Sequence, residues 1–299
     1  STLFPYTTLF RSDKKKTIEK IRVLTREAAA QKAELILFPE VFIPGYPRGL
    51  SFGTVVGSRS PEGRELFLTY WENAIEVPGP DVDELAKIAK EAKAFLILGV
   101  TEKDTISDTL YCSLLYFSPQ GELLGKHRKI KPTAAERIIW GEGDGKDLKV
   151  FNTTHGKMGG LICWENYMPL ARMALYQQGI EVYLAPTADC RQSWQATLEH
   201  IACEGRCYVL GCNQYVTKAQ YPEALQKEVA DLPSLMCSGG SVIISPLGQV
   251  LAGPLFSEEG ILYADIDHRE VVKSKMDFDV IGHYARPDIF EFHLKHNNG

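Results

Sequence analysis

The sequence predicts an α/β protein. Segments with the apolar spacing of helices alternate along the chain with short apolar runs that are typical of buried strands. The chain has 299 residues, 44% of them hydrophobic, which is enough for a large buried core. Proline, glycine and serine are dispersed, and no low-complexity linker divides the sequence. Length alone would suggest two domains, but we expect a single domain over residues 1–299.

The expected elements follow in chain order. A first helix is predicted over about residues 13–33, capped by Ser12 or Asp13, and it leads into a strand that ends at Glu40. A second helix, from Asp81 to about Lys93, leads into a strand over 95–100. Pro169 marks a helix start, since proline favours the first helical turn. The remaining predictions are a strand over 180–185, a helix over 192–205 and a strand over 207–214.

Two turns with the same signature lie in the two halves of the chain, at 118–121 (Ser-Pro-Gln-Gly) and 245–248 (Ser-Pro-Leu-Gly). Proline presets the second position of a type I turn and glycine is favoured at the fourth, so each segment predicts a hairpin between two strands. The repetition suggests an internal duplication of sheet units backed by helices.

Cys163 is the candidate nucleophile among seven cysteines, because it lies where the strand-like run 157–163 gives way to a helical pattern. A thiol at a helix N-terminus is expected to have a lowered pKa and more thiolate. Buried packing is the commoner role of cysteine. Cys190, Cys203, Cys207 and Cys212 are predicted to lie in or near the core, and their spacing does not match a zinc site.

A carboxylate and an ammonium also close predicted strands. Glu40 ends the apolar run 35–40, and Lys129 ends the run 123–129. Taken alone, Glu40 could be a solvated cap, and the basic cluster around Lys129 could be a solvated face. Glu136 follows in a polar segment, where an exposed glutamate is the default expectation.

Three motifs together resemble the signatures of the nitrilase superfamily of carbon–nitrogen hydrolases. They are 38–40 (Phe-Pro-Glu), 127–133 (His-Arg-Lys-Ile-Lys-Pro-Thr) and 163–166 (Cys-Trp-Glu-Asn), and their order and spacing match as well. The resemblance runs from about residue 18 to the segment 282–288. Cys-Trp-Glu followed by a helix that starts with proline is similar to the nitrilase branch, whereas amidase and carbamoylase branches more often place Tyr-Asp after the cysteine. The resemblance implies a four-layer α-β-β-α sandwich.

The resemblance also implies roles for a Glu-Lys-Cys triad. The Cys163 thiolate would add to a nitrile carbon to give a thioimidate and later a thioester, with Glu40 as the base. Lys129 would stabilise developing negative charge, together with the backbone N–H of Trp164. Glu136 resembles the second glutamate of the family and would orient Lys129.

Three aromatic residues are expected near the strand ends: Tyr46, Trp140 and Trp164. They could form the wall of a largely apolar substrate pocket, with core packing as the competing interpretation. His127 could be mistaken for a general base, but its place beside Lys129 in a strand favours a structural role.

Three functions remain open from the sequence. The first is a nitrilase acting on an aliphatic, aromatic or arylaliphatic nitrile. The second is an amidase or carbamoylase with the same triad, and the third is a scaffold or binding protein without activity, whose mark would be a missing triad residue. No cofactor or metal is expected.

The composition also bears on partners. Net charge is −5 without an extended basic patch, and no apolar run approaches the roughly 18 residues of a membrane helix, so neither nucleic acid nor membrane is an expected partner. An odd number of cysteines and no secretory segment predict reduced thiols and a cytoplasmic location. The resemblance implies a homo-oligomer built from dimers. Residues 1–12 lack the opening strand motif of the family and are either a cloning remnant or an atypical first strand, and 283–299 form a short C-terminal tail.

Overall fold

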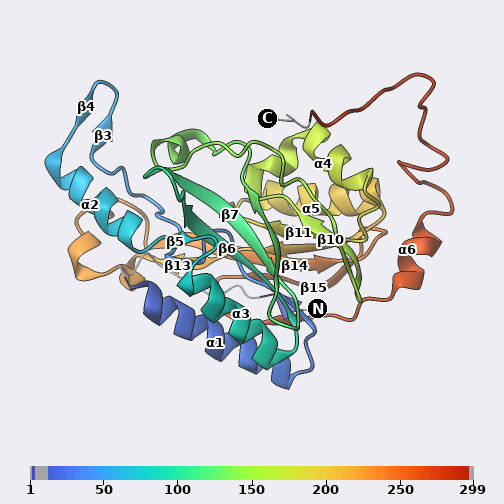
Figure 1. Cartoon of the computed structure of the whole chain (residues 1–299), viewed down its shortest axis with the longest axis horizontal. Helices are drawn as coiled ribbons and strands as arrows, with labels where there is room; N and C mark the ends of the chain where they lie inside the picture. The colour runs from blue at the N-terminus through green and yellow to red at the C-terminus, as the bar shows by residue number, and fades with distance from the viewer. Residues whose placement is uncertain (1, 4–12, 296–299) are drawn as a thin grey trace.

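Two twisted sheets packed face to face form the centre of the protein, and helices cover their outer faces (Figure 1). The structure is a computed structural model that describes residues 2–3 and 13–295. Within those residues each of the two main sheets has seven strands. The arrangement is the four-layer α-β-β-α sandwich that the sequence resemblance implied.

The first sheet comes from the N-terminal half of the chain, with one strand from its end. Its strand order is β16-β1-β2-β6-β7-β8, and β5 pairs with β6. The strands are β1 (Thr2–Leu3), β2 (Leu35–Leu37), β5 (Ile75–Glu76), β6 (Phe95–Lys103), β7 (Leu110–Phe117), β8 (Leu123–Arg128) and β16 (Leu262–Tyr263). β2 and β6 are parallel, with Leu35 opposite Phe95, whereas β6, β7 and β8 are antiparallel neighbours.

The second sheet comes from the C-terminal half, in the order β13-β14-β12-β11-β10-β9, with β15 paired to β14. The strands are β9 (Phe151–Thr153), β10 (Gly156–Gly160), β11 (Val182–Pro186), β12 (Tyr208–Cys212), β13 (Tyr215–Thr217), β14 (Leu235–Ile244) and β15 (Val250–Phe256). Its centre, β10-β11-β12, is parallel, so the C-terminal ends of these strands lie at one edge.

Four helices form the outer layers. α1 (Lys14–Ala30) and α3 (Pro80–Ala92) pack on the first sheet, and α4 (Pro169–Tyr176) and α5 (Gln192–Gly205) pack on the second. Asp13 caps α1 by accepting a 3.1 Å hydrogen bond from the backbone N–H of Lys16, which is one of the two caps expected. These helices match the predicted ranges within a few residues.

Alternation of side chains divides the core into three layers. On β2, Leu35 and Leu37 face the second sheet, while Ile36 faces α1 and α3. On β11, Val182 likewise faces the first sheet, while Tyr183 packs against the outer helices α4 and α5. Both faces of each sheet are therefore buried, which is why these strands read as continuous apolar runs in the sequence.

Both predicted hairpins are present, one in each sheet. The N–H of Gly121 donates to the carbonyl of Ser118 at 2.9 Å in the turn between β7 and β8, and the N–H of Gly248 donates to Ser245 at 2.9 Å between β14 and β15. The two glycines have nearly the same positive φ, 81° and 82°. A left-handed exit from each turn explains the preference for glycine there.

Several elements were not predicted. Between residues 54 and 72 the chain forms a small hairpin and a helix, where the sequence shows neither a clear strand nor a clear helix pattern. The other unpredicted elements include the strands β5, β9, β13 and β16. The elements not yet described are β3 (Thr54–Val55), β4 (Ser58–Arg59), α2 (Pro61–Glu72), α6 (His268–Ser274) and the short 3-10 helices η1 (Ala134–Ile138), η2 (Cys163–Tyr167), η3 (Lys218–Gln220) and η4 (Glu223–Leu225), of which η2 follows the helical pattern predicted after Cys163.

The two ends of the chain carry separate predictions. Residues 2–3 form β1, which pairs with β2 and β16. The interpretation of residue 1 and residues 4–12 as a remnant falls outside the described residues. In the expected tail, 283–295 form turns and extended segments without a helix or strand.

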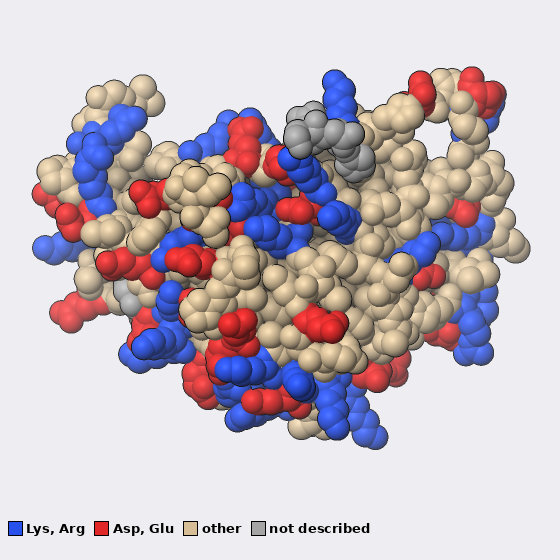
Figure 2. Space-filling model, in the orientation of Figure 1, with Lys and Arg blue, Asp and Glu red and all other residues tan. Residues whose placement is uncertain are grey.

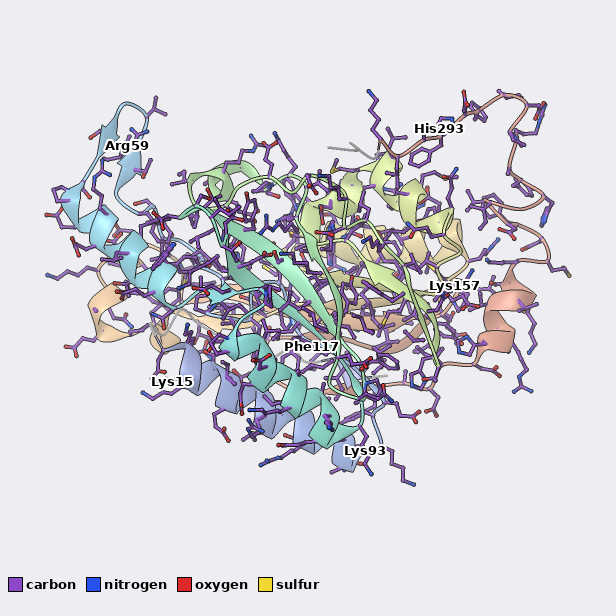
Figure 3. All side chains as sticks on the ribbon, in the orientation of Figure 1. Lys15, Arg59, Lys93, Phe117, Lys157 and His293 are labelled. Atoms are coloured by element: carbon purple, nitrogen blue, oxygen red, sulfur yellow. The ribbon has the colours of Figure 1, made fainter. Side chains whose placement is uncertain are left out.

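Charged side chains of both signs alternate over the face shown in Figure 2, with no continuous basic surface. Figure 3 shows side chains filling the space between the layers, among them the buried Phe117, while Lys15 and Lys93 extend outward. Of the helices in the part of the chain described here, none combines the length and apolar character that crossing a membrane requires. Among the same residues there is no cluster of three or more histidine, cysteine or acidic side chains suited to a metal ion.

Gly99 of β6 brings the turn that carries Glu40 close to the first sheet. A Cβ at this position would lie 2.3 Å from the carbonyl oxygen of Pro39 and 2.5 Å from the backbone nitrogen of Val41. Both are backbone atoms that cannot move alone. We expect Gly99→Ala to lower the free energy of unfolding in urea by roughly 2 kcal/mol, since overpacking a core costs about that much.

The same substitution is expected to reduce any activity that depends on Glu40, because the added methyl group displaces the turn. Gly57→Ala is the control, since a Cβ there meets open space and only the left-handed backbone costs about 1 kcal/mol. Equal losses of stability in the two variants, with Glu40-dependent activity intact in Gly99→Ala, would contradict this account.

Candidate active site

The candidate active site lies where strands of the two sheets end next to each other. Glu40 lies three residues after β2 and Lys129 directly follows β8, both in the first sheet. Cys163 follows β10 and begins η2, and Thr187 follows β11, both in the second sheet. The charges of Glu40 and Lys129 act on Cys163, and Glu136 and Cys163 line one hollow, so the expected strand ends converge, although Glu40 and Cys163 lie just beyond their strands.

Lys129 is the centre of the cluster. Its Nζ lies 2.7 Å from Oε1 of Glu40 and 2.7 Å from Oε2 of Glu136, and all three side chains are buried. Burial lowers the pKa of Lys129, but the charge of Glu40 more than reverses that effect, and the pKa lies well above 10.5. Lys129 is therefore an ammonium held between two carboxylates.

Glu136 is held in place by its own turn. Its Oε2 accepts a 2.7 Å hydrogen bond from the backbone N–H of Thr133, and its Oε1 accepts one of 2.7 Å from the Tyr46 hydroxyl. Burial, followed by the charge of Glu136, raises the pKa of Tyr46 well above 10, so the hydroxyl keeps its proton. The exposed location that would be the default for Glu136 is thus not observed, and its geometry suits orientation of Lys129.

Glu40 has one oxygen available. Oε1 contacts Lys129 and accepts a hydrogen bond from the Cys112 thiol at 3.6 Å, whereas buried Oε2 has no hydrogen-bond partner within the described residues. Burial, and then the charge of Glu136, raise the pKa of Glu40 above 4.5 against the effect of Lys129. This carboxylate can therefore accept a proton more readily than an ordinary surface glutamate.

Cys163 occupies a constrained backbone position at the start of η2, with φ of 52°. Its Sγ accepts a hydrogen bond from the hydroxyl of Thr187 at 3.2 Å. Val41 and Ala134 also have positive φ, at 46° and 47°, next to Glu40 and near Glu136. Left-handed backbone at residues other than glycine is costly, and its gathering here is typical of functional sites.

The expectation that a helix dipole lowers the pKa of Cys163 is wrong. Burial and the charge of Glu40 raise the pKa of this thiol to about 12, despite Lys129 and the hydrogen bond from Thr187. η2 has only five residues, too short for a strong dipole. At neutral pH the thiol is protonated, so a base must remove its proton when it attacks.

His127 has the structural role that the sequence favoured. Its Nε2 lies 3.0 Å from Oε2 of Glu165. The Glu165 carboxylate also accepts hydrogen bonds from the backbone N–H groups of Ile130 at 2.6 Å and Ile162 at 2.7 Å. The N–H of Ile162 immediately precedes Cys163. The buried pair therefore joins the end of β8 to the loop that carries the thiol.

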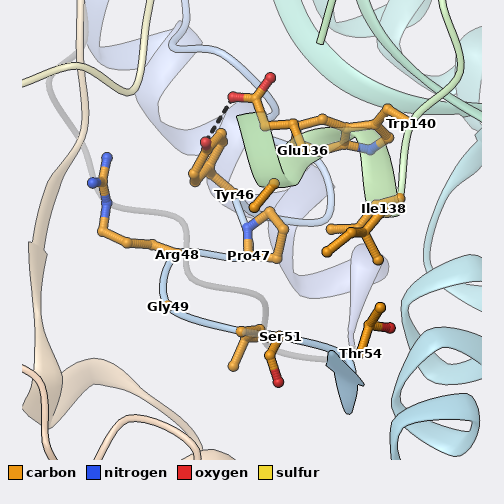
Figure 4. Close-up of a pocket in the computed structure, with 12 residues that line it drawn as sticks. Tyr46, Pro47, Arg48, Gly49, Ser51, Thr54, Glu136, Ile138 and Trp140 are labelled. Atoms are coloured by element: carbon orange, nitrogen blue, oxygen red, sulfur yellow. Dashed lines mark hydrogen bonds between the residues drawn. The ribbon is translucent and has the colours of Figure 1, made fainter. Parts of the chain in front are cut away.

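Two adjacent hollows open beside the cluster. The larger, about 460 Å³, is lined by Trp140, and the smaller, about 260 Å³, is lined by Cys163 and Trp164. Both hollows are lined by Tyr46, Arg48 and Glu136. Figure 4 shows Tyr46, which is hydrogen-bonded to Glu136, between Arg48 and Trp140. Trp164 is 40% exposed and Trp140 only 3%, so Trp164 is the more accessible wall.

The sequence analysis did not single out three residues that contact the cluster. Thr187 follows a predicted strand and could have been found by the same strand-end argument as Glu40. Cys112 lies inside β7, and Gln214, which donates from Nε2 to the Glu40 carbonyl at 2.7 Å, comes from the second sheet. No local signal marks these two, because their contacts join segments far apart in the sequence.

Comparison with known proteins shows the family to which this chain belongs. The sequence profile described as carbon-nitrogen hydrolase matches residues 5–275. The chain is 51% identical over 294 residues to a bifunctional nitrilase/nitrile hydratase, NIT4B, of Nicotiana tabacum. This match covers 97% of this chain and 84% of the relative. It is 52% identical over 281 residues to an aliphatic nitrilase of Sinorhizobium fredii, covering 94% and 90%. The chain therefore belongs to the carbon–nitrogen hydrolase family, in its nitrilase branch.

Solved structures support the fold alone. A carbon-nitrogen hydrolase from Helicobacter pylori superposes with a TM-score of 0.75 over 97% of this chain and 95% of its own, at 20% identity. Nit3 of Saccharomyces cerevisiae, a nitrilase-superfamily member, superposes with a TM-score of 0.73 over 95% of both chains, also at 20% identity.

The His127–Glu165 pair has a testable dependence on pH. Burial lowers the pKa of His127, but Glu165 outweighs it, so the pKa lies above 6.5. The stabilisation from charged His127 is therefore complete below pH 6.5 and is lost as the pH rises through the raised pKa. The pKa of Glu165 is lowered, since His127 and two backbone N–H groups outweigh burial, so Glu165 stays ionised throughout this range.

We expect His127→Gln to lower the free energy of unfolding near pH 6 by roughly 3 kcal/mol, as for a broken buried pair. Urea titrations at increasing pH give the free energy of unfolding of both proteins. The variant's deficit in this free energy should become smaller above the folded-state pKa of His127. A surface substitution, His293→Gln, should show no such trend, since His293 is exposed. A difference that is constant or widens with pH would contradict the assignment.

Proposed function

We propose that this protein is a nitrilase, which converts an organic nitrile and two water molecules into a carboxylic acid and ammonia through a covalent intermediate on Cys163. The observation that carries the proposal is the convergence of Glu40, Lys129 and Cys163 at one point between the sheets. The names of the tobacco and Sinorhizobium relatives support the choice of nitriles.

The first step is addition of sulfur to the nitrile carbon. Because the pKa of the Cys163 thiol is about 12, the proton leaves as the S–C bond forms, and the raised pKa of Glu40 makes its carboxylate the acceptor. The nitrile nitrogen takes up a proton, and a thioimidate results. The open Oε2 of Glu40 is the atom suited to this transfer.

The later steps use the same carboxylate. A water molecule, deprotonated by Glu40, adds to the thioimidate carbon, and the C–N bond breaks to release ammonia and leave a thioester. A second water hydrolyses the thioester, which frees the acid and returns the proton to Cys163. Loss of sulfur instead of ammonia from the tetrahedral intermediate would release the amide.

Lys129 supplies fixed positive charge. Its Nζ faces the intermediate from between Glu40 and Glu136, and the backbone N–H of Trp164 is the second donor that we propose for the developing negative charge. Donors held in advance in a buried site stabilise such charge more than water does. Glu136 acts by positioning Lys129 rather than by taking a proton.

The organic group of the nitrile would occupy the hollow beside Cys163, between Tyr46 and Trp164, and extend toward Trp140. Together the two hollows are large enough for an aliphatic or an aromatic substituent. The proposed steps use only water and groups of the protein chain.

Two proposals about the cellular context come from the sequence. Reduced cysteines support a cytoplasmic location, and the family resemblance supports a homo-oligomer built from dimers. Light scattering at several protein concentrations distinguishes dimers and larger assemblies from a monomer.

The reaction class is tested by a panel of nitriles and the matching amides, with acid, amide and ammonia measured for each. We expect ammonia and acid from at least one nitrile, and a loss of more than about 10⁴-fold in Cys163→Ala, since the nucleophile is gone. Cys203→Ala is the control, because Cys203 is an exposed thiol outside the cluster, and its predicted place in or near the core is wrong. Circular dichroism establishes that both variants fold.

Each outcome of the panel has a consequence. Turnover of amides without nitriles would assign the protein to amidases or carbamoylases, and wild-type activity in Cys163→Ala would exclude the covalent mechanism. Turnover of neither class by the folded parent protein would favour a scaffold role.

The role of Glu40 predicts the acid limb of the pH profile. The base must be ionised, so kcat/KM should fall as the pH decreases through the pKa of Glu40, which lies above 4.5. Glu40→Gln should lower kcat by roughly 10²–10⁴-fold and remove that limb. An unchanged acid limb in this variant would show that another group accepts the proton.

A further inference from the structure

A second cysteine, Cys190, lines the hollow that contains Cys163. It lies between β11 and α5 and is half-buried, with Arg48 and Asp189 also in the wall. The proposed nitrile chemistry makes no use of this thiol. Its exposure at the hollow makes it accessible to small reagents.

Cys237, on β14, is the neighbour of Cys190. Cys190 packs against the core cluster that contains Cys237, and the Cys237 thiol contacts the carbonyl oxygen of Ala188 at 4.0 Å and Oδ1 of Asn213 at 3.7 Å. Nδ2 of Asn213 donates to the carbonyls of Asp189 at 2.8 Å and Gly239 at 2.7 Å. Asn213 thus fixes the segment that carries Cys190 against β14.

The surroundings favour a thiolate on Cys190. The hydrogen bond from the Cys237 thiol, followed by the backbone N–H of Ser238 and the charge of Arg48, lowers the pKa of Cys190 to about 5. The same hydrogen bond and burial raise the pKa of Cys237. Arg48 donates from Nη2 to the carbonyl of Ala188, its Nε is buried without a hydrogen bond, and no carboxylate among the described residues forms an ion pair with it. A thiolate on Cys190 would therefore supply the negative charge that complements the Arg48 guanidinium.

We propose that Cys190 and Cys237 form a peroxide-sensitive thiol pair in the wall of the active-site hollow, in which Cys190 is oxidised first and Cys237 then closes a disulfide. The proposal is independent of the substrate of Cys163. It rests on the contacts that hold the segment of Cys190 against Cys237 and β14, on the neighbouring Arg48, and on the opening of Cys190 to the hollow.

The chemistry balances with hydrogen peroxide as the oxidant. The Cys190 thiolate attacks one peroxide oxygen, the O–O bond breaks, and the leaving hydroxide takes a proton to become water, which leaves a sulfenic acid. The Cys237 sulfur then attacks the Cys190 sulfur, the S–O bond breaks, and the Cys237 proton leaves with the hydroxyl as a second water. Two thiols lose two electrons in total, and one peroxide is reduced to two waters.

Disulfide formation would change the hollow. It removes the negative charge of Cys190 from beside Arg48 and joins the loop after β11 covalently to β14. Figure 4 shows the Arg48 guanidinium on the opposite side of Tyr46 from Trp140, so its positive charge would then lie at that end of the pocket without the neighbouring Cys190 thiolate.

The test is peptide mapping of the full chain after treatment with hydrogen peroxide and alkylation under non-reducing conditions. Trypsin separates the cysteines concerned into different peptides: 158–172 with Cys163, 173–191 with Cys190, 192–206 with Cys203 and 228–269 with Cys237. We expect a linked 173–191/228–269 species that dithiothreitol removes. In Cys237→Ser, which keeps a hydroxyl donor, Cys190 should instead be trapped by dimedone as the sulfenic acid.

Alkylation of the reduced protein gives an independent measurement. At about pH 5.5, where an ordinary thiol is almost fully protonated, iodoacetamide should modify Cys190 roughly tenfold faster than the exposed Cys203. Peroxide linkage of Cys190 to Cys163, or no linkage together with slower alkylation of Cys190 than of Cys203, would overturn the proposal. None of these measurements depends on nitrile turnover, so failure here is distinguishable from failure of the proposed function.

Discussion

The buried ammonium of Lys129 is the interaction on which the site depends. Moving a charge of this kind out of water costs several kcal/mol, and the two carboxylates at 2.7 Å offset that cost. The same contacts leave one carboxylate oxygen of Glu40 open and keep Glu136 occupied with Lys129, Tyr46 and the backbone N–H of Thr133. Two glutamates of the same chemical type thereby acquire different roles, one suited to accept a proton and one suited to position a cation.

The sandwich makes this cluster possible because each sheet contributes part of it. The first sheet brings Glu40 and Lys129 on the ends of β2 and β8, and the second brings Cys163 after β10. Contacts across the interface fix the two halves, among them the hydrogen bond from Gln214 to the Glu40 carbonyl. A small residue at Gly99 then lets the Glu40 turn lie directly on the sheet. Stability and site geometry are therefore coupled at this edge.

The sequence predicted the parts of the fold that local patterns encode. The helix at 192–205 and both hairpins follow from apolar spacing and turn chemistry, and the cluster follows from three polar residues at strand ends. The pKa of Cys163 was not predictable, because it depends on burial and on Glu40, which is more than a hundred residues away in the chain. The thiol pair of Cys190 and Cys237 was also invisible, since only the folded chain brings the two together.

The central claim is that Cys163 rests as a neutral thiol and gives its proton to Glu40 during attack. Thiolates absorb in the far ultraviolet and thiols do not, so the difference in absorbance between the parent protein and Cys163→Ser, measured from acid to neutral pH, reports the charge of this sulfur alone. Any other thiolate, including the one proposed on Cys190, is common to both proteins and cancels. We expect no difference at neutral pH. A thiolate signal at neutral pH that disappears in Cys163→Ser would contradict the claim and show that the nucleophile is already ionised before substrate binds.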